Sequence, residues 1–164
     1  MRKVLSLLVE NNPGVLSRVA GLFSRRGYNI TSLTVGETAN PAYSRMTVVA
    51  EGDEQILEQI KKQLGKLIDV IDIKTLKPDA SVCRELILVK VRVRDEQRQS
   101  VITMADVFRG KVVDVGLDSL IIELTGQQNK LDAFLRLLKD YEILELARTG
   151  ITGLSRGSDG VRYL

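Results

Sequence analysis

The 164-residue sequence contains no histidine, no tryptophan and a single cysteine, and aromatic residues make up only 4% of it. Histidine is the commonest general base, proton shuttle and zinc ligand, so its absence removes the usual routes to catalysis and to zinc binding. Because there is no histidine, Cys/His and Ser/His nucleophile pairs are excluded. Because Cys83 is the sole cysteine, an internal disulfide framework is excluded too. We therefore expect a protein without catalytic residues and without a metal site.

The sequence also lacks blocks of like charge and long apolar runs. Its net charge is +3, and the 24 lysines and arginines are dispersed, which argues against a basic tail for nucleic acid. The apolar run after Arg2 and Lys3 gives way to a polar turn at Asn11, so it is too short for a signal peptide or a membrane span. We expect a cytosolic protein that binds neither nucleic acid nor membranes.

The first half of the sequence alternates between strand-like and helix-like segments. Residues 3–10 are apolar on nearly both faces, which is typical of a buried central strand. Apolar residues then recur at helical spacing from Val15, and Gly27 suits the helix C-cap, which predicts a helix at 13–26. The remaining predicted elements are strands at 29–38, 43–51 and 67–76 and a helix between Asp53 and Gly65.

The same order of elements then repeats. Residues 85–94 alternate between apolar and polar side chains, which predicts a half-buried strand. Helices follow at 101–108 and 131–138, and strands at 111–116, 119–125 and 142–149. The order βαββαβ therefore occurs twice, which predicts an α+β fold of two tandem ferredoxin-like domains.

We expect the first domain at 1–76, a linker at 77–81, the second domain at 82–150 and a flexible, glycine-rich tail at 151–164. A four-stranded sheet with helices on one face leaves its other face open. Because residues 3–10 place apolar side chains on that second face too, we expect it to be an interface through which the chain self-associates.

The segment between the first strand and the first helix is the candidate binding site. The N–H groups that open a helix carry partial positive charge and bind anions such as carboxylates. Gly14 has no Cβ to hold a carboxylate away from the backbone, and Asn11 adds an amide that donates and accepts. The same residues suit an ordinary helix start, with Asn12 as N-cap and Pro13 in the first turn. The pattern alone leaves a cap and a carboxylate site both open.

The segment ENNPGVLSRVAGLFSRRGYNITSLTVG resembles the start of an ACT domain, a βαββαβ module that senses small molecules. In particular, the segment is similar to the start of the ACT domain in the regulatory (small) subunits of acetolactate synthase, also called acetohydroxyacid synthase. The resemblance continues through RELILVKV, FRGKVVDV, KLDAFL and GLSRG, and therefore spans nearly the whole chain.

The resemblance implies a non-catalytic subunit that activates a catalytic large subunit and confers feedback inhibition by valine in branched-chain amino acid biosynthesis. In this family two ACT domains pair as a homodimer, and valine or another branched-chain amino acid binds between them. The catalytic subunit carries thiamine diphosphate, FAD and magnesium, whereas the regulatory chain carries no cofactor. The family's effector pocket maps onto Asn11, Gly14, Val15 and Leu16 of one protomer and Asn29 and Ile30 of its partner, with Ser17 nearby.

Two other classes of function stay open at this point. The first is a free-standing ACT-type signalling or transcriptional regulator that binds amino acids, although no basic recognition helix is present in the sequence. The second is a small enzyme on a ferredoxin-like scaffold, against which the missing histidine argues. Co-purification with a large thiamine-diphosphate enzyme would separate both from a regulatory subunit.

Four further features have ordinary structural interpretations. The stripe of Lys90, Arg92 and Arg94 is the solvated face of a strand rather than a docking surface for an acidic partner. The aspartate pairs lack a nearby third metal ligand, and we interpret Cys83 as incidental. We hypothesise that the loop at 37–43 contacts the catalytic subunit. The two aspartate pairs are Asp69 with Asp72 and Asp114 with Asp118.

Overall fold

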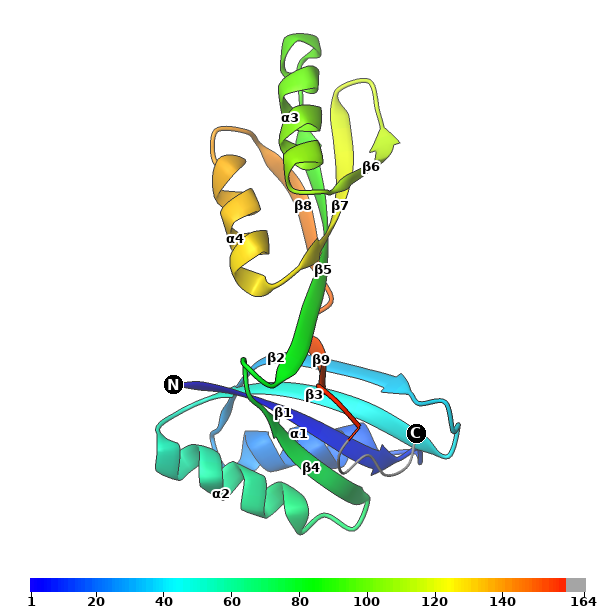
Figure 1. The fold of residues 1–164 in the computed structure, drawn as a ribbon, viewed down its shortest axis with the longest axis vertical. Helices are drawn as coiled ribbons and strands as arrows, with labels where there is room; N and C mark the ends of the chain where they lie inside the picture. Colours follow the sequence, from blue (N-terminus) through cyan, green and yellow to red (C-terminus); the bar gives the residue numbers. More distant parts are fainter. Residues whose placement is uncertain (159–164) are drawn as a thin grey trace. The chain divides into compact units, whose positions relative to one another are not determined.

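The computed structural model describes residues 1–158 and divides into two compact units. Unit 1 comprises Met1–Cys83 and the segment that starts at Ile151, and unit 2 comprises Arg84–Gly150. Figure 1 shows the helices and strands of both units. No helix within the described residues is both long enough and apolar enough to cross a bilayer.

Unit 1 repeats the predicted order of elements. They are β1 (Arg2–Glu10), α1 (Val15–Arg25), β2 (Asn29–Glu37), β3 (Tyr43–Glu51), α2 (Glu54–Gly65) and β4 (Val70–Leu76). The sheet has the order β2-β3-β1-β4 with antiparallel neighbours, so β1 lies inside it and β2 is an edge strand. Both helices pack on one face of the sheet, where Leu7, Phe23 and Ile60 belong to one buried cluster.

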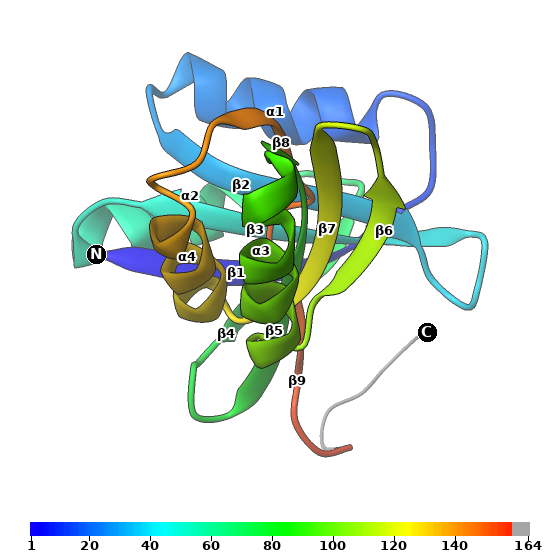
Figure 2. The same ribbon diagram turned by 90° about the horizontal axis from the view of Figure 1, so that it is seen from above.

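Unit 2 has the same topology. Its elements are β5 (Ser81–Arg92), α3 (Asp95–Val107), β6 (Lys111–Val115), β7 (Ser119–Gly126), α4 (Gln128–Leu137) and β8 (Ile143–Arg148). The strand order β6-β7-β5-β8 matches that of unit 1, and α3 and α4 cover one face (Figures 1 and 2). The predicted α+β fold of two ferredoxin-like βαββαβ sets is therefore confirmed.

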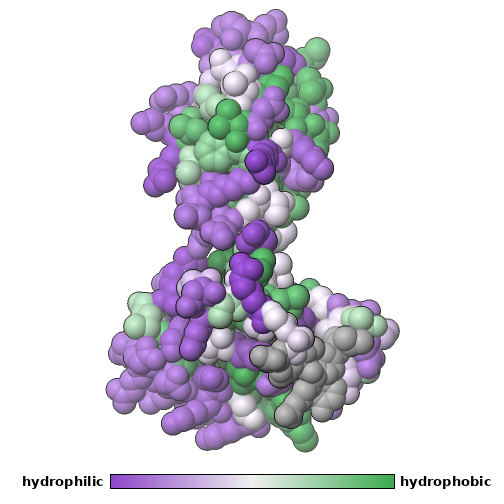
Figure 3. Space-filling model, in the orientation of Figure 1, coloured by the Kyte–Doolittle hydropathy of each residue, from purple (hydrophilic) through white to green (hydrophobic). Residues whose placement is uncertain are grey.

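The edge strand β6 gives unit 2 an apolar border. Val113 and Val115 of β6 are exposed, and Leu117 in the following turn is 96% exposed. Figure 3 shows apolar surface over this part of unit 2, whereas hydrophilic residues dominate the visible surface over α2.

The prediction of a flexible tail is wrong for Ile151–Ser155. Thr152–Ser155 form a further strand, β9, which pairs with β5, and the Arg156 N–H donates to the Ala80 carbonyl (2.9 Å). The backbone of Ile151 is bonded to two hydroxyls of β2, its N–H to Ser32 Oγ (2.8 Å) and its carbonyl to Thr34 Oγ1 (3.3 Å). Residues 159–164, the rest of the predicted tail, lie outside the described residues.

Gly153 in this segment allows close packing against β5. A Cβ on Gly153 would lie 2.6 Å from Cys83 Sγ and 2.9 Å from the Val82 carbonyl oxygen, so only glycine lets β9 approach the start of β5. The residues at 77–80 form a hydrogen-bonded turn, and Ser81–Cys83 already belong to β5 and to unit 1. Unit 1 therefore extends beyond the predicted boundary at residue 76.

This returning segment covers the second face of the unit 1 sheet, which the sequence had led us to expect open. On that face Leu8 and Val49 are 1% and 0% exposed, and Ser6 and Thr47 are buried with them. Figure 1 shows β9 and the start of β5 on the side of the sheet opposite α1 and α2. Because β1 is covered on both sides by its own chain, its apolar character does not by itself indicate an intermolecular interface.

Candidate functional site

Helix α1 starts differently from the prediction. Gly14, not Asn12, is the N-cap; it has a left-handed backbone (φ 85°), and no side chain caps the helix. The Asn12 side chain donates instead to Glu10 Oε2 (3.0 Å), because the left-handed residue places Asn12 outside the first turn. Asn12 contributes only its carbonyl oxygen, which accepts a hydrogen bond from the Val15 N–H at 3.4 Å.

The start of α1 retains donors for an anion. A helix leaves its first N–H groups without acceptors inside the helix, and here these include those of Leu16 and Ser17. The Val15 bond of 3.4 Å is long compared with the usual 2.9–3.0 Å, so that N–H is held weakly. The arrangement suits a carboxylate placed at the end of the helix axis.

Asn11 is fixed to the hairpin between β2 and β3. Its side-chain nitrogen donates to the Pro41 carbonyl (2.9 Å) and to Glu37 Oε1 (3.2 Å), and its backbone N–H donates to the Ala42 carbonyl (2.8 Å). A carboxamide has two N–H hydrogens and one acceptor oxygen, and both hydrogens are used here. Among the described residues nothing donates to the Asn11 amide oxygen, which is left as an acceptor for an ammonium group.

Arg18 and Asp69 are the site residues that the sequence did not reveal. Arg18 Nε donates to Asp69 Oδ2 at 2.6 Å, and the Asp69 side chain is only 8% exposed. A Cβ on Gly14 would lie 3.0 Å from Arg18 Nη1, so a guanidinium fills the space beside Gly14 that we had assigned to a ligand. Arg18 follows Gly14 by four residues, a helical neighbour spacing, whereas Asp69 is distant in sequence.

The structure brings together only part of the predicted pocket. Asn11, Gly14, Val15 and Leu16 lie together around the start of α1; the Val15 side chain is buried, and that of Leu16 is 47% exposed. Asn29 and Ile30 lie at the opposite end of β2 from Glu37, the residue bonded to Asn11. Eight residue steps along a strand separate these ends by about 27 Å. Within one chain the two groups do not meet.

The basic stripe singled out in the sequence has acidic partners inside its own unit. Arg92 pairs with Asp118 (2.6 Å) and Glu142 (2.9 Å), and Lys90 pairs with Glu145 (3.2 Å), so acidic side chains neutralise the basic stripe. In residues 1–158 no three His, Cys, Asp or Glu side chains are grouped so that they could hold a metal ion.

Two family models match the chain, one after the other along the sequence. The "AHAS small subunit-like ACT domain" matches residues 5–72, and the "small subunit of acetolactate synthase" matches residues 84–157. The chain belongs to the acetolactate synthase small-subunit family. The first match confirms the predicted ACT domain, and the second extends the resemblance over unit 2.

Individual members of the family are similar along their whole length. The chain is 55% identical to the probable acetolactate synthase small subunit of Methanothermobacter thermautotrophicus, over 94% of this chain and 93% of that one. It is 50% identical to the isozyme 3 small subunit of Salmonella typhimurium, over 99% and 100%. The crystal structure of the small subunit from Thermotoga maritima has a TM-score of 0.89 and 42% identity, covering 96% and 99% of the two chains.

Proposed function

We propose that this chain is a non-catalytic regulator that activates the catalytic large subunit of acetolactate synthase and makes it sensitive to inhibition by valine. The observation that carries the proposal is the pairing of opposite polar groups at the start of α1. Free N–H groups at the start of the helix favour a carboxylate, and the Asn11 amide oxygen favours an ammonium. An α-amino acid carries both groups on one carbon.

The position of β2 supports a site shared between two protomers. β2 is an edge strand of nine residues that runs from Asn29 to Glu37, and its outer backbone groups are available for pairing. Antiparallel pairing with a second β2 about a two-fold axis places Asn29 of the partner beside Glu37, and therefore beside Asn11. The two halves of the predicted pocket, separated in one chain, meet in this dimer.

The apolar side chains at this end of unit 1 suit a short branched ligand. Leu16 in the first turn of α1 and Val35 near the end of β2 are 47% and 48% exposed, although both are apolar. A bound side chain of the size of valine would cover part of this surface, while Ile30 of the partner would close it from the other side. Valine is therefore the effector we propose first, ahead of its larger relatives.

The chemistry of the enzyme belongs to the large subunit in this proposal. The thiamine diphosphate, FAD and magnesium that the family resemblance implies would all be held there. This chain would contribute binding energy and a response to valine, and its residues would not contact the reacting atoms.

Calorimetry with valine and two truncated analogues tests the site. We expect valine to bind the wild-type protein with a Kd between micromolar and millimolar. Isobutylamine lacks the carboxylate and 3-methylbutyrate lacks the ammonium, so each should bind at least about tenfold more weakly, because a charge-assisted hydrogen bond is lost. The absence of heat and of thermal stabilisation with valine, leucine and isoleucine would refute the proposed effector site.

A further inference from the structure

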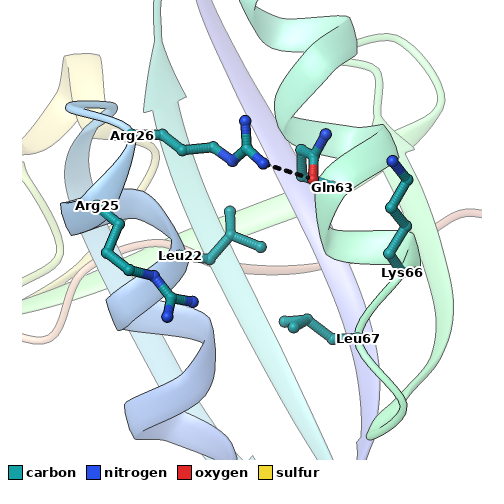
Figure 4. A pocket seen from close by; sticks show the side chains of 6 residues that line it. All are labelled: Leu22, Arg25, Arg26, Gln63, Lys66 and Leu67. Atoms are coloured by element: carbon teal, nitrogen blue, oxygen red, sulfur yellow. Dashed lines mark hydrogen bonds between the residues drawn. The ribbon is translucent and has the colours of Figure 1, made fainter.

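Unit 1 has a concave surface between the C-terminal ends of α1 and α2. It encloses about 500 Å³, and Figure 4 shows the six side chains that line it. Leu22 and Leu67 supply the apolar part, while the long side chains of Arg25, Arg26 and Lys66 surround it. Gln63 completes the lining and accepts a hydrogen bond from Arg26 Nη2 (3.1 Å). We call this surface the basic groove.

The basic groove carries positive charge without a matching negative charge. No acidic residue lines it, and none of its three cations forms an ion pair with a carboxylate of residues 1–158. Arg18, on the same helix as Arg25, shows the contrast, since it is paired with the buried Asp69. An anionic partner from outside the chain would supply what the groove lacks.

The cations are not needed to cap the helices. At the end of α1 the carbonyl oxygens of Leu22, Phe23 and Ser24 already accept backbone N–H groups, at 3.4, 3.0 and 3.3 Å. At the end of α2 those of Gln63 and Leu64 do the same, at 3.2 and 3.1 Å. Cations often occur near helix C-termini because of the dipole, but here these five carbonyls already have backbone partners.

The remaining surfaces of unit 1 indicate what kind of anion fits. The second face of the sheet is covered by the chain's own C-terminal segment, and the β2 edge is the proposed dimer interface. The helix face is then the broad surface left for a large partner. Exposed cations bind a small anion weakly because water and salt screen them, whereas a protein segment adds apolar contact with the half-buried Leu67.

We propose that the basic groove is a docking site for an acidic segment of the catalytic large subunit. This inference rests on the proposed function, because it takes the large subunit as the partner. Carboxylates of that segment pair with Arg25, Arg26 and Lys66, and an apolar side chain between them packs on the half-buried Leu67. The contact lies at the opposite end of α1 from the effector site.

Affinity for the purified large subunit, without valine and at two salt concentrations, tests the site. The double variant Arg25→Glu/Lys66→Glu should bind at least about tenfold more weakly than wild type, and the difference should shrink as salt rises. The matched control is Lys62→Glu/Lys77→Glu, which makes the same charge change at exposed lysines outside the groove. Thermal unfolding of both variants checks that they fold.

Three results would overturn the docking site. The first is equal weakening by the two double variants, which assigns the effect to net charge. The second is a groove variant that binds the large subunit as tightly as wild type but loses the stabilisation that inorganic phosphate gives against thermal unfolding. That result would assign the groove to a free anion. The third is the absence of any complex with the wild-type protein, which removes the proposed function as well. Valine calorimetry on the isolated groove variant should match wild type, and loss of valine binding alone would leave the docking site standing.

Discussion

Gly14 has two structural reasons to be glycine, and neither of them was predicted from the sequence. Its φ of 85° is a left-handed conformation that costs other residues about 1–2 kcal/mol. In addition, Arg18 Nη1 lies 3.0 Å from the place of a Cβ, because Asp69 holds that guanidinium from the far side. The sequence showed the glycine and the helix start, but it could not show a contact made across 51 residues.

Gly14→Asp should remove the response to valine while activation of the large subunit persists. The new carboxylate would lie beside Arg18 and repel the carboxylate of the effector, which we expect to weaken valine binding by about 2–4 kcal/mol. Gly14→Ala introduces a side chain without the charge and should have a smaller effect. Valine titrations of the reconstituted enzyme measure both, and full inhibition of the Asp variant would show that the carboxylate is bound elsewhere.

Arg18→Ala should destabilise unit 1 by about 1–3 kcal/mol, because it leaves the carboxylate of Asp69 buried without its partner. Because the Arg18 side chain is half-exposed, we expect the loss of unfolding free energy to lie in the lower part of the range for breaking buried pairs. In the double variant Arg18→Ala/Asp69→Asn much of that loss should be recovered, since no charge remains to be paired. Denaturant unfolding measures these two variants and the single variant Asp69→Asn, and simply additive effects would contradict this account of the pair.

Thr47 is a buried residue whose hydroxyl has no hydrogen-bond partner within residues 1–158. Thr47→Val removes that unsatisfied group at almost unchanged shape, so we expect unit 1 to gain up to about 1 kcal/mol of unfolding free energy. Ser6→Ala is the control on the neighbouring strand, because Ser6 accepts a bond from Arg45 (3.1 Å) and its loss should destabilise. A destabilising Thr47→Val would reveal a partner of the hydroxyl.

At the scale of elements, the periodicity of apolar residues predicted nearly every helix and strand that packs through a regular apolar stripe. Each predicted strand and helix of the two βαββαβ sets is present. The strand β9 was missed because its packing depends on one apolar anchor, Ile151, and on the missing side chain of Gly153. A short strand of this kind has no period to detect, and its glycine content resembles that of a mobile tail.

Gly153→Ala tests the role of β9 in covering the sheet of unit 1. The added methyl group would meet Cys83 Sγ at 2.6 Å, and the overpacking should cost about 1–3 kcal/mol. Gly21→Ala is the matched control, because nothing lies within 4 Å of its added Cβ and alanine favours a helix by about 1 kcal/mol. Thermal unfolding should therefore shift in opposite directions, and equal shifts would contradict close packing at Gly153.

At the scale of the whole molecule, the sequence showed the family but not how the effector site is completed. Asn29 and Ile30 were assigned to the pocket by resemblance, and the fold places them at the far end of β2 from Asn11. Their contribution therefore depends on a second protomer. This part of the site cannot be derived from one chain, because the contacts that form it are intermolecular.

Val35→Asp should weaken the dimer and valine binding together. Val35 is half-exposed on the β2 edge, and a charge there would be desolvated in a β2–β2 interface. Val115→Asp places the same charge on the exposed edge of unit 2 and should leave both properties unchanged. Sedimentation with and without valine measures the two properties, and a monomer that binds valine at full affinity would contradict the shared site.

The central claim, regulation of a large subunit by valine, is tested most directly by the rate of acetolactate formation in a reconstituted system. The catalytic large subunit should be faster when this chain is added, and valine should then reduce the rate only when this chain is present. The contradicting result is a large subunit whose rate and valine response are the same with and without this chain.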